Sequence, residues 1–177
     1  MLPESKIEKI LKSNKKPKEI VTLLAQALNN DKTLVNELIG CFKAGSTADK
    51  GNCIEALEYV TQQDPEFAEN CLDFVIESLT DKAPRVKWEA SRIIGNVAKR
   101  FPKEVSKAIP KLLENTMDKG TVVRWSAAFA LTEIAKSNLG LQKELVNKFV
   151  EILAKETNNG VKNVYLKALK FIDKNKG

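Results

Sequence analysis

Two tryptophans are the residues of this sequence best suited to bind a partner, because each stands at the same place in one of two similar stretches. Trp88 lies in residues 81–91 and Trp125 in residues 118–128, so the rings are 125 − 88 = 37 positions apart. A basic residue directly precedes each ring, and a basic or aromatic residue follows each at helical spacing. Rings beside basic groups suit acidic peptides, or nucleic acid through phosphate contacts and stacking. The candidate partner-binding residues are Lys87, Trp88, Arg92, Arg124, Trp125 and Phe129.

The same rings have a purely structural alternative. Large aromatic side chains are more often packed than free. Trp88 and Trp125 would then complete the seam between helices of neighbouring units. An exposed aromatic patch would instead favour the binding interpretation.

Catalytic chemistry has little support in the sequence. The chain contains no histidine, which removes the commonest general base, the imidazole of catalytic triads and most catalytic metal sites. The sequence also has no glycine-rich phosphate loop and no nucleophile–base pair. Carboxylate, lysine or thiolate chemistry remains open. We therefore expect a protein that is not an enzyme and that uses no cofactor.

The three cysteines predict buried thiols rather than a metal site. Their number is odd, none forms a Cys-x-x-Cys pair, and no second group of ligands is available for zinc. Cys41, Cys53 and Cys71 each lie among apolar neighbours at helical spacing, as expected for thiols that behave as small hydrophobes. We expect no metal to bind.

The composition is that of a globular protein with a basic surface. Hydrophobic residues make up 43% of the chain and charged residues 29%, and the net charge is +6. An acidic partner would complement this charge, whereas a solvated lysine-rich surface is the alternative. No apolar run approaches the ~20 residues that span a bilayer, and residues 1–6 lack the layout of a secretory signal. We expect a cytoplasmic protein with no membrane partner.

Apolar residues recur at helical spacing along the whole chain, and no segment alternates with period two, so every element is predicted to be a helix. Pro17 can open a helix at its first position, and Asp31 can cap the next one. Gly45 is expected to be left-handed just past a helix. Asp64, which precedes a proline, is expected to start a helix, and Pro110 to kink a helix or displace its start.

Three of the predicted helices share one apolar pattern. Aligned from Val86, Val123 and Val161, they carry apolar residues at offsets 0, 4, 7, 8 and 11. A fixed period of this size is typical of a stacked helical repeat, and a helix near Cys53 extends the series at a shorter spacing. The residues predicted to be almost fully buried are Val86, Ala90, Ile93, Val123, Ala127, Ala130 and Leu131.

The two similar stretches resemble the HEAT-repeat family, in the armadillo-like class of α-solenoids. The motif that carries the resemblance is Asp-turn-Val-(Arg/Lys)-x-x-Ala, which begins at Asp81 and again at Asp118. In that family the motif starts the second helix of a repeat, which lines the concave surface, and its Asp and Arg form a ladder along the stack. The sequence departs from the pattern through lysines at positions 87 and 162 and through Glu156 in place of Asp. The implied ladder residues are Asp81, Asp118, Lys87 and Arg124.

The resemblance implies an all-α fold, an α-solenoid (superhelix) of about four HEAT-like helical pairs in a curved right-handed stack. We expect a single domain over residues 1–177. Its repeats are clear over residues 46–177, and its N-terminal helices over residues 1–45 are less regular.

The function that the resemblance implies is a non-catalytic protein-binding scaffold or adaptor that uses its concave face. Its partner would be another protein with an acidic and apolar surface. The alternative is a nucleic-acid-binding solenoid, related to the HEAT-like glycosylases that excise alkylated bases from DNA with concave tryptophans and an aspartate. No carboxylate of this sequence matches the catalytic one, because Asp81 and Asp118 are expected in turns. A phycobilin lyase-type activity also occurs on short HEAT-like repeats, but nothing beyond the repeat favours it here.

Overall fold

The computed structural model describes residues 3–176, and every regular element in that range is helical. None of these helices is both long and apolar enough to cross a membrane. The elements are α1 (Lys6–Leu11), α2 (Pro17–Asn30), α3 (Leu34–Ala44), α4 (Thr47–Gln63), η1 (Pro65–Ala68), α5 (Leu72–Ser78), α6 (Pro84–Val97), α7 (Pro102–Val105), η2 (Ser106–Ala108), α8 (Ile109–Asn115), α9 (Thr121–Ser137), α10 (Leu139–Leu153) and α11 (Asn159–Lys174), where η marks a 3₁₀ helix.

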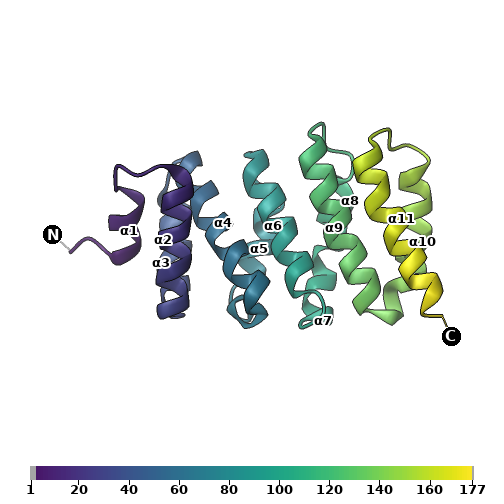
Figure 1. Cartoon of the computed structure of the whole chain (residues 1–177), viewed down its shortest axis with the longest axis horizontal. Coiled ribbons are helices and arrows are strands. Elements are labelled where there is room, and N and C mark those ends of the chain that lie inside the picture. Colours follow the sequence, from purple (N-terminus) through teal and green to yellow (C-terminus); the bar gives the residue numbers. More distant parts are fainter. Residues whose placement is uncertain (1–2, 177) are drawn as a thin grey trace.

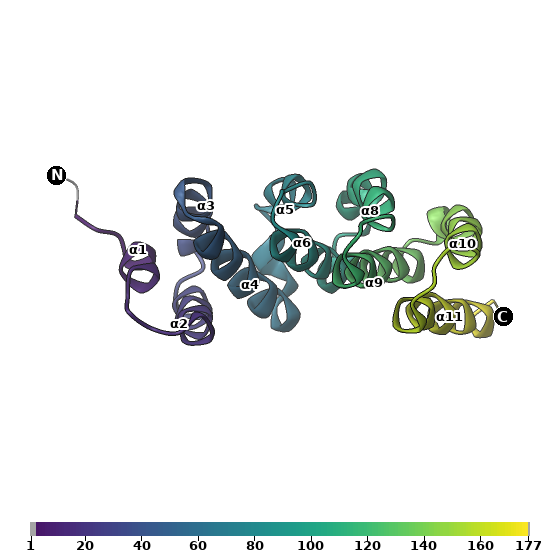
Figure 2. The same cartoon turned by 90° about the horizontal axis from the view of Figure 1, so that it is seen from above.

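The helices form pairs that are stacked in a row (Figure 1). Helices α3, α5, α8 and α10 make an outer layer, and α2, α4, α6, α9 and α11 make an inner layer (Figure 2). Each inner helix packs against the next one along the row. The row is arched, because α2 and α11 are displaced to the same side of α6, and the inner layer therefore lines a concave face (Figure 2). The predicted all-α solenoid is confirmed.

Residues 3–176 form five helical pairs, which extends the expected series of about four by one. The added pair is α1 with α2. Helix α1 has only 6 residues, but it packs against both α2 and α3 and buries Ile7 completely. The N-terminal segment lacks the Asp-Val motif, yet its apolar stripe is enough to join the stack, since burial of that stripe stabilises a helix more than its intrinsic propensity does.

Two of the predicted helix starts are confirmed. Pro17 occupies the first position of α2, where its missing N–H leaves no hydrogen bond unmade. Pro110 lies in the first turn of α8, which begins only after the 3₁₀ helix η2, so this proline displaces the helix start rather than kinking a longer helix.

Three other local predictions differ from the structure. Gly45 is extended (φ −84°, ψ 169°), because Ser46 follows it directly as the N-cap of α4 and the connection has no room for a left-handed turn. Asp31 does not cap the start of α3, whose N-cap is Thr33: it is the C-cap of α2, and its carboxylate accepts hydrogen bonds from the N–H and hydroxyl of Thr33 in the turn. Asp64 starts the 3₁₀ helix η1 rather than an α-helix, and α5 begins at Leu72.

The repeat register predicted the core correctly. All seven residues that share the repeated apolar positions have no exposed surface, namely Val86, Ala90, Ile93, Val123, Ala127, Ala130 and Leu131. Cys53 and Cys71 are buried as expected, and burial raises the pKa of each thiol to about 12. Cys41 differs, because it is only partly buried at the edge of the core.

Candidate binding surface on the inner helices

A ladder of ion pairs joins successive helical pairs at the turns that precede the inner helices. Each rung links a basic residue in the first turn of one inner helix to a carboxylate in the turn before the next inner helix. The spacing of the basic residues is 37 positions, which places α4 in the same register as α6 and α9. The rungs are Lys50–Asp81 (3.6 Å), Lys87–Asp118 (3.0 Å) and Arg124–Glu156 (2.9 Å).

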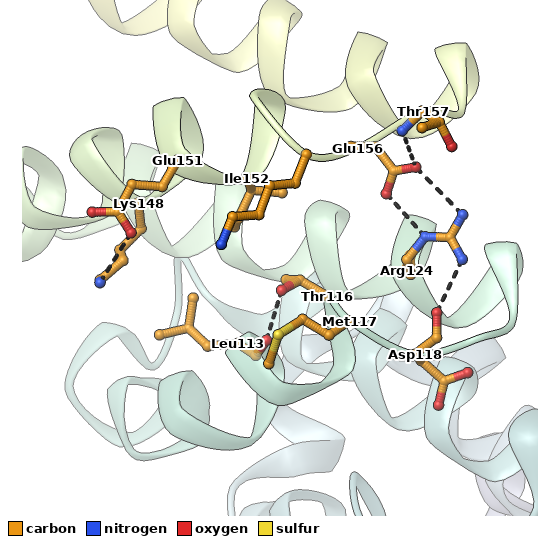
Figure 3. Close-up of a pocket in the computed structure, with 11 residues that line it drawn as sticks. Leu113, Thr116, Met117, Asp118, Arg124, Lys148, Glu151, Ile152, Glu156 and Thr157 are labelled. Carbon is orange, nitrogen blue, oxygen red and sulfur yellow. Dashed lines mark hydrogen bonds and ion pairs between the residues drawn. The ribbon is translucent and has the colours of Figure 1, made fainter.

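The third rung is the most buried, and Figure 3 shows its geometry. The Arg124 guanidinium donates to both Glu156 carboxylate oxygens and to the Asp118 carbonyl oxygen. Glu156 Oε1 also accepts from the N–H groups of Thr157 and Asn158. Burial alone would raise the pKa of Glu156, but the bonds from Arg124 and Asn158 outweigh it and hold the pKa below its ordinary value.

The carboxylates of the first two rungs likewise bind both a basic side chain and a backbone N–H. Asp81 accepts from the Ala83 N–H at 2.8 Å, and Asp118 accepts from the Gly120 N–H at 2.7 Å. Each carboxylate therefore shapes the turn before an inner helix and ties that turn to the previous repeat. The ladder predicted for Asp81 and Asp118 is confirmed as a set of contacts.

The expected cluster of free basic charge around the tryptophans is wrong. Lys87 and Arg124 belong to the ladder. Arg92 contacts two carboxylates, Glu58 at 3.0 Å and Glu89 at 3.4 Å. Ion pairs within the protein therefore neutralise all three cations, and most of the acidic partners come from neighbouring repeats, more than 30 positions away in the sequence.

Trp88 lies in a polar network between α4 and α6. Its indole N–H donates to Glu89 Oε1 at 2.9 Å, and the ring is half-buried. Burial raises the pKa of Glu89 to about 7, although the Trp88 hydrogen bond and the Arg92 guanidinium act in the opposite direction. Glu58 is similarly buried and also accepts from the Asn96 amide at 3.2 Å. For Trp88 the structural interpretation is the better one.

Neither Glu58 nor Glu89 was singled out in the sequence. Each residue has less than 5% of its surface exposed, on a helix whose other buried residues are mostly apolar. The repeat itself could have pointed to Glu58, because the equivalent positions 37 and 74 residues later hold Gly95 and Thr132. Glu58 contacts α6, Gly95 contacts α9, and Thr132 lines the hollow between α9 and α11.

Trp125 has a different environment from Trp88. It is 40% exposed and stacks on Phe129, with ring centroids 6.0 Å apart and planes 9° apart. Phe129 is seated on Gly95 of α6, where a Cβ atom would lie 2.7 Å from Phe129 Cδ1. Because Gly95 has no side chain, the Phe129 ring can lie directly on the α6 backbone and support the tryptophan.

A hollow of about 390 Å³ opens beside this platform, between α9 and α11. We call it the aromatic hollow. Lys136 lies on its wall, paired with Glu133 at 2.7 Å, and Lys167 projects from α11 without an ion pair to any carboxylate of residues 3–176. The residues that define the hollow are Trp125, Phe129, Lys136, Asn163, Val164 and Lys167.

A larger cavity, about 560 Å³, lies between the outer helices α8 and α10 beside the third rung (Figure 3). Leu113, Met117 and Ile152 form its apolar part, and Met117 is 80% exposed. Lys148 on its rim is paired with Glu151. Among the described residues, none of those that line this cavity is aromatic, and the Arg124–Glu156 rung that forms one wall already makes its hydrogen bonds within the protein.

Comparison with known proteins identifies the fold and no closer relative. No family model and no curated protein matches the chain. Solved structures match over most of its length. One is a chain from the complex of CpcE and CpcF of phycocyanin lyase from Nostoc sp. PCC7120, with 23% sequence identity and a TM-score of 0.72. The match covers 92% of this chain and 97% of that chain.

Designed proteins match as well. A designed armadillo repeat protein in complex with the peptide (KR)4 is 18% identical with a TM-score of 0.70, over 93% of this chain and 79% of that chain. Computationally designed armadillo repeat proteins for modular peptide recognition give 20% identity and a TM-score of 0.71 over the same shares. The fold is an armadillo/HEAT-like α-solenoid. At these identities the likeness shows the fold alone.

Proposed function

We propose that the chain is a non-catalytic protein-binding scaffold, and that its concave face holds an acidic and apolar segment of another protein at the aromatic hollow. The observation that carries the proposal is the Trp125–Phe129 stack, which leaves a large ring exposed on a rigid support beside Lys136 and Lys167.

A supported ring of this kind is a good anchor. The stack on Phe129 and the seat on Gly95 fix the Trp125 ring before a partner arrives, so little side-chain entropy is lost on binding. Tryptophans in such positions dominate the energy of many interfaces, with costs of ~2 kcal/mol or more on truncation to alanine.

The charge beside the ring selects the partner. Lys136 and Lys167 outnumber Glu133 at the hollow, and no carboxylate in the described part of the chain pairs with the Lys167 ammonium group. A partner that places an apolar side chain on the ring and a carboxylate on Lys167 would gain ring burial and a charge-assisted hydrogen bond together. In this proposal the acidic group of the partner binds the lysines on α9 and α11 that line the hollow, instead of Lys87, Arg92 and Arg124.

The matching structures support binding of a peptide only in general terms. Two of them are armadillo proteins designed to bind peptides, and the third is part of a two-protein complex. The peptide (KR)4 in one of them is basic, whereas the hollow of this chain carries lysines, so we expect the opposite charge preference here.

The test is a selection from a random displayed peptide library against the full chain, followed by titration of the selected peptides. We expect enrichment of Asp and Glu next to Leu, Phe or Trp. Trp125→Ala should weaken binding by ~1–2 kcal/mol or more and change the free energy of unfolding little. Lys167→Glu should weaken binding too. Tyr59→Ala, which removes an aromatic that is 53% exposed on α4, is the matched control and should have no effect.

Three results would contradict the proposal. The first is the selection of basic peptides. The second is binding that Trp125→Ala leaves unchanged. The third is a loss of stability of about 3 kcal/mol or more in Trp125→Ala, which would identify the ring as core. Titration with labelled single-stranded DNA tests the alternative partner, since affinity that falls steeply with salt would favour nucleic acid.

A further inference from the structure

The helices α10 and α11 present a face on which residues 3–176 leave three repeating contacts unmade. In earlier repeats the equivalent positions are covered or paired by the next helical pair. The register of 37 positions identifies these positions residue by residue, with one extra position before α11. The chemistry of the missing contacts can therefore be inferred from contacts that the protein already makes.

The first contact belongs to the inner layer and buries a residue that is apolar in two of the three earlier helices. Ile54, Ser91 and Ala128 occupy one position in α4, α6 and α9, and all three have no exposed surface. The equivalent residue of α11 is Leu166, which is 50% exposed. Its neighbour Leu169 is partly exposed as well, although the three earlier residues of its series are completely buried, namely Leu57, Ile94 and Leu131.

The second contact is apolar and belongs to the outer layer. Ile76 of α5 is 9% exposed, and helix α8 covers this region: the Lys111 ammonium donates to the Ile76 carbonyl at 3.5 Å. Leu113 takes the same position in α8 and faces the cavity beside α10. Val150 takes it in α10 and is 59% exposed.

The third contact is the ladder. Lys50, Lys87 and Arg124 each reach a carboxylate of the next turn. Lys162 is the next residue of that series, and no carboxylate of residues 3–176 forms an ion pair with it. An acidic group placed as Glu156 is placed for Arg124 would complete a fourth rung.

We propose that this α10–α11 face, defined by Val150, Lys162, Leu166 and Leu169, docks a helical pair of a different protein whose turn presents an aspartate or glutamate to Lys162. Apolar side chains of that pair cover Leu166 and Val150 as α11 and α10 cover α9 and α8. The site lies on the opposite side of α11 from the aromatic hollow, so both surfaces can be occupied together.

Charge decides between a different protein and a second copy of this chain. The opposite end of the row is already covered by α1, and residues 4–19 there contain six lysines and three glutamates. Head-to-tail stacking would put those lysines against Lys162 and Lys170, and face-to-face pairing would put two such lysine-bearing faces together. Like charges at close range disfavour both arrangements.

The binding test uses the full chain and a probe taken from its own repeat. The probe is residues 102–138 fused to a carrier protein, because this segment holds α8 and α9 and carries the rung acid Asp118 in its turn. We expect saturable binding, which Leu166→Glu or Lys162→Glu in the chain weakens roughly tenfold. Lys162→Glu should regain affinity for a probe that carries Asp118→Lys. Lys167→Glu, the same charge change on the hollow side of α11, is the matched control and should have no effect.

Two results together would overturn the proposal. The carrier-fused probe would not bind, and the same segment fused after residue 176 would add no helical circular dichroism. Binding that Leu166→Glu leaves unchanged would do the same. A concentration-dependent dimer in sedimentation that Leu166→Glu abolishes would assign the face to a second copy instead. A photo-cross-linker at position 166 in the producing cell should couple to a helix next to an acidic turn of another protein. It should still do so in Trp125→Ala, which separates this site from the hollow.

Discussion

Gly95→Ala is the substitution that tests the support of the aromatic platform most directly. Gly95 is buried in α6 against Phe129 of α9. An added Cβ would lie 2.7 Å from Cδ1 and 2.9 Å from Cζ of the Phe129 ring, well inside van der Waals contact. The ring is held on its other side by its stack with Trp125, so it has to tilt or lift from the helix, and Trp125 moves with it.

Two opposing effects set the magnitude. Overpacking of a well-packed contact costs ~1–3 kcal/mol, whereas alanine in place of glycine inside a helix gains ~0.5–1 kcal/mol. Gly95→Ala alone should therefore lower the free energy of unfolding by roughly 0–2.5 kcal/mol. In a Phe129→Ala background the clash is absent, and the same change should raise it by ~0.5–1 kcal/mol.

The assay is urea unfolding of the four proteins of this double-mutant cycle, combined with tryptophan fluorescence. The sign reversal of Gly95→Ala between the two backgrounds is the decisive result, because it isolates the contact from helix propensity. The coupling free energy should be ~1–3 kcal/mol, and the emission of Trp125 should shift in Gly95→Ala alone. Additive effects within ~0.5 kcal/mol would refute the seat on Gly95.

Three further substitutions test the core, the ladder and the buried carboxylate. Ala127→Leu should destabilise by ~1–3 kcal/mol, since Ala127 has no exposed surface; a neutral effect in urea unfolding would place it outside the core. Arg124→Ala should cost roughly 2–3 kcal/mol because it strands buried Glu156, whereas Lys50→Ala on a more exposed rung should cost less than about 1 kcal/mol; equal costs would contradict the burial argument. The folded pKa of Glu89, about 7, exceeds its ordinary 4.5, so its contribution to stability is present below pH 4.5 and lost as pH rises to 7. Glu89→Gln should remove that loss, at most ~3 kcal/mol, and an unchanged pH profile would contradict it.

The repeat made most of the fold predictable from sequence. One apolar series, read at offsets from Val86 and Val123, gave the buried face of two helices, and the motif from Asp81 and Asp118 gave the ladder. The core and the ladder were both predicted from a repeated pattern, so a wrong register in one repeat would have disagreed with the other repeat. The fifth pair was missed as a repeat because α1 has only 6 residues and carries no motif.

The charge of the candidate site could not be predicted in the same way. Arg92 was expected to be a free cation, although Glu89, three positions before it, stands at ion-pair spacing on a helix. Its shorter contact is with Glu58, which lies 34 positions away. The structure brings Glu58 within 3.0 Å, since consecutive inner helices lie side by side. Which cation is neutralised depends on the register between helices, and that register is visible only once the helices are packed.

The two tryptophans show the same limit. They occupy one repeat position, yet Trp88 donates to a buried carboxylate and Trp125 stacks on a phenylalanine. The difference arises one turn further along each helix, where Arg92 in α6 corresponds to Phe129 in α9. A sequence position therefore predicted where each ring lies but not what surrounds it.

One inter-helix contact explains why binding is expected at α9 and α11 rather than in the middle of the concave face. Between α4 and α6 it is the ion pair of Glu58 with Arg92, and between α6 and α9 it is Phe129 on Gly95. At the next interface the equivalent residues are Thr132 and Lys167, and both line the aromatic hollow. The contact thus changes along the row from an ion pair to a packed ring, and then to a lysine that pairs with no carboxylate of residues 3–176. Among residues 3–176, the hollow between α9 and α11 therefore combines this lysine with the exposed ring of Trp125, whereas Arg92 between α4 and α6 already pairs with Glu58.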